Sequence, residues 1–155
     1  MRHTLPWLVA LGILAAMTNV LQLRSPELAR LRHPRPGYSP EQVAGFQLAA
    51  LKECDRPTPN AGIWSAFQFS SPANRRDTGP YGRFLQLVKG PNYRALLNAR
   101  SAEIGRAEIA GDQARLRVIG ISREGHASRY LVMLSRQTAG AYRGCWMTDA
   151  MLPER

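Results

Sequence analysis

Two carboxylates on predicted strands, Glu103 and Asp149, are the residues best placed to do proton chemistry. A carboxylate held in an apolar pocket can rise in pKa and serve as a general base. A base made of histidine and carboxylate is disfavoured, because His126 is the sole histidine after residue 35 and falls in a predicted hairpin turn. The competing interpretation is structural: Glu103 pairs with an arginine and Asp149 caps the last strand. We therefore predict no catalytic set, with an enzyme that uses a lone carboxylate as the alternative.

Metal and cofactor chemistry is not expected, so we predict neither. No group of histidine, cysteine and carboxylate residues has the spacing of metal ligands. The glycines at Gly79 and Gly82 lack the lysine and hydroxyl residues of a phosphate-binding loop. The two cysteines, Cys54 and Cys145, match no metal motif. In an exported protein they could form one disulfide; the alternative is two buried free thiols.

A ligand site in this chain would have to be built from aromatic residues and arginines. Aromatic side chains are more often core than ligand contacts, but a pocket between helices and sheet would be lined by them. Arginine suits an acidic ligand because its guanidinium pairs with a carboxylate through two hydrogen bonds; its structural alternative is a salt bridge. The predicted ligand-binding set is Arg83, Phe84, Tyr93, Arg100, Glu103, Tyr130, Trp146 and Asp149.

The net charge of +10 invites a nucleic-acid interpretation. The first 35 residues carry five of the 21 basic residues and one of the 11 acidic ones, which leaves the remainder at about +6. The remaining basic residues are almost all arginine and are scattered along the sequence. A basic footprint indicates nucleic acid when it is clustered. We therefore predict no nucleic-acid partner.

The first 23 residues predict a signal peptide or an uncleaved signal anchor. Arg2 precedes an unbroken apolar run from Trp7 to Met17, which is short for a spanning helix and suits a signal-peptide core. No good cleavage site follows the apolar run, so an uncleaved signal anchor remains the alternative to a cleaved signal peptide. We expect a domain outside the cytoplasm; the alternative is an anchored, cytoplasmic domain, because arginines after the run outnumber Arg2. Proline-rich residues 24–38 indicate a linker before a single domain at 39–152.

The first half of that domain has helical signals. Ser39, Pro40 and Gln42 have the spacing of a capping box with proline in the first turn, and apolar residues follow at helical period. Further helical segments are predicted near 62–69, from 70–75 and at 81–88, where the apolar stripe has spacing i, i+3, i+4, i+7. Another turn is expected near 93–97.

From residue 100 the pattern becomes typical of strands. Strands are predicted near 100–109, 114–122, 128–137 and 142–149, separated by glycine-containing turns. Short connections favour an antiparallel meander. Helices followed by such a sheet indicate an α+β fold, with N-terminal helices packed on a curved antiparallel sheet of about four strands.

Several segments resemble an uncharacterised family of bacterial and plastid proteins, known as a domain of unknown function. They are Phe67 to Arg75, Thr78 to Pro80 with Arg83 and Phe84, Arg100 to Glu103, Leu134 to Gln137, and Gly144 to Asp149. The likeness covers about residues 39–152. The family in turn resembles the nuclear-transport-factor-2-like superfamily, a cystatin-like, polyketide-cyclase-like cone in which helices wrap a curved sheet around a pocket. The resemblance implies no activity, because such folds host enzymes, binders and scaffolds alike.

These observations lead to one functional hypothesis and two rivals. The leading hypothesis is an exported or membrane-anchored, non-catalytic module that binds a small ligand or a partner protein, with membrane contact through the N-terminal segment alone. The first rival is the enzyme with a lone carboxylate at Glu103 or Asp149. The second is a scaffold that forms a homodimer through the outer face of the sheet.

Overall fold

The computed structural model describes residues 32–155, which form one compact unit. The predicted signal segment and residues 24–31 of the predicted linker lie outside the described residues. Within 32–155 no helix has the length and apolar character needed to cross a membrane.

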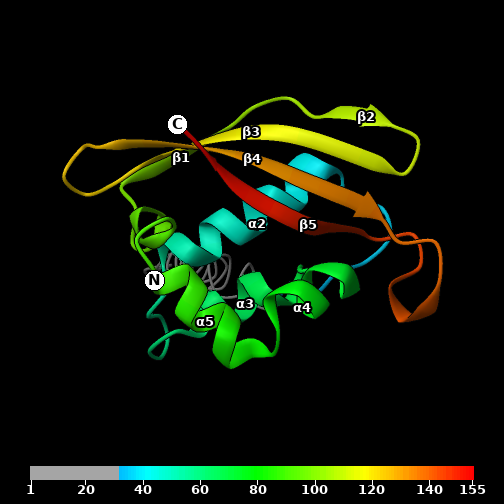
Figure 1. Ribbon diagram of the computed structural model, residues 1–155, viewed down its shortest axis with the longest axis horizontal. Coiled ribbons are helices and arrows are strands. Elements are labelled where there is room, and N and C mark those ends of the chain that lie inside the picture. The colour runs from blue at the N-terminus through cyan, green and yellow to red at the C-terminus, as the bar shows by residue number, and fades with distance from the viewer. Residues whose placement is uncertain (1–31) are drawn as a thin grey trace, which may run out of the picture. The chain divides into compact units, whose positions relative to one another are not determined.

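Helices in the first half of the unit cover one face of an antiparallel sheet formed by the second half (Figure 1). This layout confirms the predicted α+β class and the order of helices before strands. The helices are α2 (Pro40–Lys52), α3 (Ala61–Gln68), α4 (Pro72–Thr78) and α5 (Tyr81–Lys89), with short 3-10 turns η1 (Arg94–Leu96) and η2 (Gly140–Tyr142). The strands are β1 (Ser101–Ile104), β2 (Glu108–Ala110), β3 (Gln113–Ile121), β4 (Ala127–Arg136) and β5 (Trp146–Glu154).

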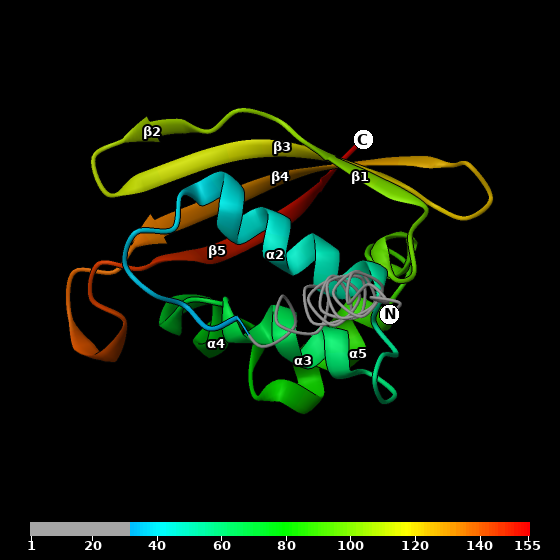
Figure 2. The same ribbon diagram turned by 180° about the vertical axis from the view of Figure 1, so that it is seen from behind.

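The long helix α2 lies across the inner face of the sheet, as the reverse view shows (Figure 2). It begins where the sequence predicts: the Ser39 hydroxyl accepts a hydrogen bond from the Gln42 backbone, and the Gln42 side chain accepts one from the Ser39 backbone. Val43, Gln47 and Leu51, one helical repeat apart, are buried toward the sheet and α3. The core between the two layers is completed by Leu116, Val118, Tyr130, Val132 and Leu134.

The sheet order is β1-β3-β4-β5, and β2 also pairs with β3. The strand predicted at 100–109 is therefore two short strands on the same edge of β3. Gly105 lies at the break, where its N–H donates a 2.8 Å hydrogen bond to the Arg117 carbonyl. Nearby the Glu41 carboxylate of α2 accepts a 2.9 Å hydrogen bond from the Ala107 N–H. The Glu41 side chain thus satisfies the Ala107 N–H between β1 and β2, where the pairing with β3 is interrupted.

The last strand differs most from its prediction. The sequence predicts this strand at 142–149, but η2 occupies its start and β5 runs from Trp146 to Glu154. A register shift against β4 between Met133 and Leu134 leaves Asp149 as the extra residue. Pro153 is compatible with β5 because this strand lies at an edge of the sheet.

The end of the predicted linker is not free of the domain. The Arg32 guanidinium lies 4.2 Å from the centre of the Phe46 ring on α2, and the Arg35 guanidinium lies 4.5 Å from that of Tyr38. Arginine pairs with aromatic faces through its charge and its flat shape. Residues 32–38 therefore pack on the domain as part of the compact unit that begins at Arg32.

Candidate functional site

A cavity of about 230 Å³ lies between the helical layer and strand β5. Its lining is predominantly apolar and comes from α2, α3, α4, α5, η1 and β5. The apolar members are Leu51, Ala66, Phe84, Leu87, Val88, Leu96, Ala150, Met151 and Leu152. Polar residues line the rest: Gln47, Ser70, Asn74, Asp77, Thr78, Tyr93, Thr148 and Asp149. An apolar concave site with a few converging polar groups is the usual form of a small-molecule site.

Two buried polar side chains meet in the lining. The Thr148 hydroxyl donates a 2.6 Å hydrogen bond to Oε1 of Gln47, and Nε2 of Gln47 donates a 3.0 Å bond to the Ala66 carbonyl. These bonds fix the orientation of the Gln47 amide and join α2, α3 and β5. The sequence carries a signal for Gln47, because it is a polar residue within the apolar stripe of α2, but it was not predicted as a site residue.

Ser70 is a polar residue of the lining whose side chain is almost fully buried, at 2% exposure. Its backbone is held in place, since Ser70 forms a parallel bridge with Thr148 of β5. Buried polar groups are usually hydrogen-bonded, so a hydroxyl in this wall is a natural partner for a ligand or a water. The next residue, Ser71, caps α4.

The charge of the lining is acidic. Among the described residues that line the cavity, Asp77 and Asp149 are the charged ones, and none is Lys, Arg or His. The Asp149 carboxylate accepts a 2.9 Å hydrogen bond from the Ser135 hydroxyl. Asp77 is exposed on α4. In a protein with a net charge of +10, this cavity therefore disfavours anions.

Side chains from the helices also cover the free edge of β5 beside the cavity. The Tyr93 hydroxyl donates a 2.8 Å hydrogen bond to the Met151 carbonyl, and the Asn74 amide donates a 2.7 Å bond to the Asp149 carbonyl. Burial raises the pKa of the Tyr93 phenol, so this group stays a donor at neutral pH. The cavity wall is thus held to the helices by specific hydrogen bonds.

Three of the eight predicted ligand-binding residues line this cavity: Phe84, Tyr93 and Asp149. Tyr130 is core, 1% exposed, with its hydroxyl bonded to the Asn92 carbonyl and its ring stacked on Tyr93. Trp146 is also buried, with the Arg136 guanidinium 5.6 Å from its ring.

The other three predicted residues lie elsewhere. Arg83 is exposed on α5, and Glu103 is exposed on β1 opposite Ile119 of β3. Arg100 lines a second, basic cavity at the end of α2. The predicted pairing of an acidic ligand with Arg83 and Arg100 is therefore not available in the apolar cavity. Glu103 is equally remote from it.

The structure differs from the expected disulfide, because Cys54 and Cys145 are both buried free thiols. Cys145 follows Gly144, which packs against Pro36 ahead of α2, whereas Cys54 follows the end of α2. A helix of 13 residues is about 20 Å long, far beyond the reach of a disulfide. Burial raises the pKa of both thiols, so neither is an activated nucleophile.

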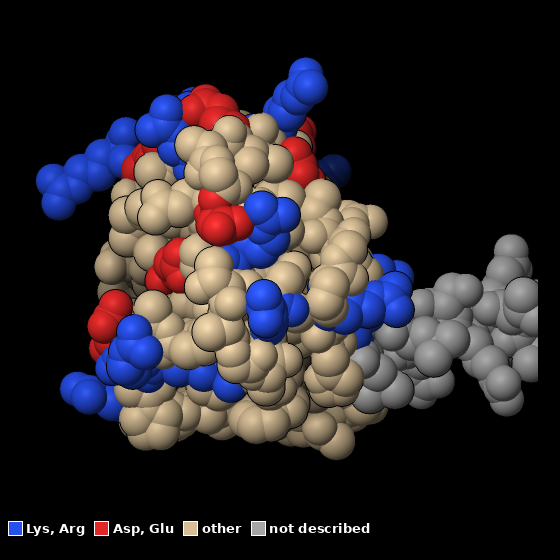
Figure 3. Space-filling model, turned by 90° about the vertical axis from the view of Figure 1, so that its right-hand side faces the viewer, with Lys and Arg blue, Asp and Glu red and all other residues tan. Residues whose placement is uncertain are grey.

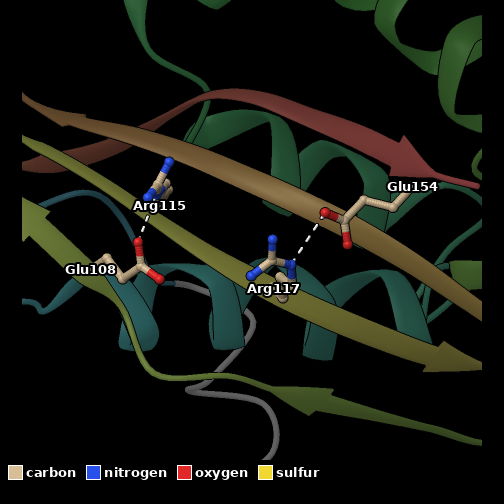
Figure 4. Close-up of polar contacts among 4 residues, drawn as sticks. All are labelled: Glu108, Arg115, Arg117 and Glu154. Carbon is tan, nitrogen blue, oxygen red and sulfur yellow. Dashed lines mark hydrogen bonds and ion pairs between the residues drawn. The ribbon is translucent and has the colours of Figure 1, made fainter.

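The outer face of the sheet is the second surface that the sequence singled out. Arg115 of β3 pairs with Glu108 of β2 at 2.7 Å, and Arg117 pairs with Glu154 of β5 at 3.2 Å (Figure 4). On this face Met133, which lies opposite Arg115, is 43% exposed. Leu152 of the edge strand β5 is 46% exposed and also lines the apolar cavity. The outer face therefore combines a small apolar strip with fixed charges.

The chain belongs to the family defined by the domain of unknown function DUF4864, whose model matches residues 39–153. This match confirms the predicted membership of an uncharacterised family. Neither a curated protein nor a solved structure matches the chain.

Proposed function

From membership of a family without an assigned activity, we propose that this domain is a binding module for a small, largely apolar molecule that is neutral or positively charged. The module would be exported or anchored in a membrane by the segment before residue 24. The proposal rests above all on the cavity itself, whose predominantly apolar lining contains a few polar groups, the buried Ser70 among them. The order of helices before a sheet, with a cavity between them, also supports kinship with the cone-shaped nuclear-transport-factor-2-like fold.

The size of the cavity limits the ligand. Dry apolar cavities of about 150 Å³ take up benzene, so about 230 Å³ suits a molecule somewhat larger than benzene. The apolar body would lie against Phe84, Leu96 and Met151, and a hydrogen-bonding group would reach Ser70. An oxygen or nitrogen atom of the ligand at that point would form a hydrogen bond with the Ser70 hydroxyl.

The lining determines the preferred charge. Asp77 at the exposed end of α4 would attract an amine, whereas a carboxylate would be desolvated without a cation to pair with. We therefore expect discrimination among ligands that share one ring system and differ in charge.

Three indole compounds provide this test: indole is neutral, tryptamine is a cation and indole-3-acetate is an anion. Calorimetric titration of the full chain should show indole and tryptamine binding at least about tenfold more tightly than indole-3-acetate, a difference of 1.4 kcal/mol. Leu87→Arg, at a half-exposed position of the lining, should reverse the preference between tryptamine and indole-3-acetate. Glu103→Gln on the outer face is the matched control and should change nothing. Equal affinity for all three, or no binding, would refute the proposal.

A homodimer formed through the outer face is the second candidate, and the exposed pair Met133 and Leu152 favours it. Light scattering over a range of concentrations would show a monomer–dimer equilibrium, and Met133→Lys would abolish the dimer. A constant monomer mass for the full chain would exclude this candidate.

A further inference from the structure

A basic cavity at the other end of α2 has no part in the proposed function. Its volume is about 350 Å³, and Lys52, Glu53, Arg56, Asn98, Ala99, Arg100 and Arg123 line it. Four cations thus face one carboxylate. Along the sequence these residues are scattered, and tertiary structure gathers them: the end of α2, the segment after η1 and the β3–β4 hairpin lie at one end of the domain (Figures 1 and 2).

The opposite end of the domain has a different arrangement of charge. There, Lys and Arg side chains lie among Asp and Glu side chains (Figure 3). One such pair is Arg136 with Asp112, at 2.7 Å. In the basic cavity, Glu53 and the negative end of α2 offset part of the charge, but the cations still outnumber the acidic groups.

The backbone of the basic cavity is firmly held. Asn98 has a left-handed conformation, with a φ of 54°, and its N–H donates a 3.0 Å hydrogen bond to the Leu51 carbonyl of α2. Its side-chain amide donates to Sγ of Cys54 at 3.2 Å. Its carbonyl accepts a 3.1 Å hydrogen bond from Nε of Arg123, and the Arg100 N–H donates a 2.8 Å bond to Ile121 of β3. Arg100 and Arg123 therefore extend from backbone that these hydrogen bonds hold in place.

We propose that this cavity is an anion site that binds a phosphate group through Arg100 and Arg123, with Lys52 and Arg56 adding positive charge. Guanidinium groups match phosphate oxygens through paired, charge-assisted hydrogen bonds. Mutual repulsion of the four cations is relieved when a dianion sits among them. The phosphate belongs to a soluble molecule or to a lipid headgroup, because both present the same chemistry.

Pyrophosphate is the probe for the first experiment, titrated into the full chain at low ionic strength with calorimetry and amide NMR shifts as readouts. We expect saturable binding with shifts centred on residues 98–100. Arg100→Gln and Arg123→Gln should each weaken binding about tenfold, whereas Arg100→Lys should lose less because the charge remains. High salt should weaken binding, since the cations are exposed.

Arg129→Gln is the matched control, because Arg129 is an exposed arginine on β4 outside the residues that line the cavity. Absence of saturable binding, or an equal loss in Arg129→Gln, would overturn the proposal, since the latter would show a response to net charge alone. Lipid vesicles distinguish a lipid headgroup from a soluble phosphate compound as the ligand. If phosphatidylglycerol vesicles displace pyrophosphate and phosphatidylcholine vesicles do not, the ligand is a lipid headgroup. If neither kind of vesicle displaces it, the ligand is a soluble phosphate compound. Indole binding should be unaffected by Arg100→Gln, so the two proposals fail separately.

Discussion

The Thr148 hydroxyl and the Gln47 side-chain oxygen lie 2.6 Å apart although 101 positions separate them in the chain. Both residues are buried, so this hydrogen bond joins the middle of α2 to β5 in the wall of the apolar cavity. It thereby links the helical half of the sequence to the last strand. Loss of the bond should affect both stability and the shape of the cavity.

Thr148→Val removes the donor and leaves Oε1 of Gln47 buried without a partner. A buried unsatisfied acceptor costs about 1–3 kcal/mol, so the free energy of unfolding in urea should fall by that amount. Gln47→Leu combined with Thr148→Val should cost less than the sum of the single changes. Thr138→Val at an exposed loop position is the control, with a change within about 0.5 kcal/mol. Additive single and double variants would contradict the coupling.

Two helical glycines should respond to alanine in opposite directions. A Cβ on Gly62 of α3 would lie 2.7 Å from Cα of Cys54 and closer still to the Ala50 carbonyl oxygen. Gly62→Ala must therefore separate α3 from α2, at a cost of about 1–3 kcal/mol or more. Gly82 of α5 has open space around its Cα, so Gly82→Ala should stabilise the protein by about 0.4–1 kcal/mol. Thermal unfolding of both variants checks this, and similar shifts for the two would contradict the packing.

Both cysteines should remain thiols in the native protein and react slowly. Burial raises their pKa, so little thiolate forms near neutral pH. A thiol reagent such as Ellman's should label two groups per chain rapidly in denaturant and much more slowly without it. A mass two units lower before reduction, in protein isolated without reductant from its own compartment, would instead indicate a disulfide and a rearranged fold.

Glu41 should make the protein less stable in acid. The hydrogen bond from the Ala107 N–H holds the pKa of this carboxyl below its ordinary value of 4.5. A lowered pKa in the folded state means that the carboxylate stabilises the fold above pH 4.5. This contribution is lost as the pH falls from there through the folded-state pKa. Glu41→Gln should therefore be less stable than the parent at pH 7, and the difference should shrink below pH 4.5. A difference constant from pH 7 to pH 3 would refute this role.

The sequence by itself determined the secondary structure of the helical half. The capping box at Ser39 and the apolar stripe of α5 are local signals, because each depends on residues within one or two turns. Strand-like alternation and glycine turns likewise gave the antiparallel sheet. The ends of β5 were not determined, because the bulge at Asp149 and the continuation to Glu154 depend on pairing with β4.

Only the tertiary structure decided which residues form the two cavities. Ser70 lies beside the α4 cap Ser71 in the sequence, and its place in a cavity wall becomes visible once α3 and β5 enclose it. Arg100 and Arg123 are 23 positions apart, and the turn of the chain at Asn98 brings them together. Local patterns specify elements, whereas a site is made by long-range packing that brings distant side chains to one place. For the same reason the sequence could not decide whether Cys54 and Cys145 form a disulfide. The structure decides it, because the length of α2 separates the two residues.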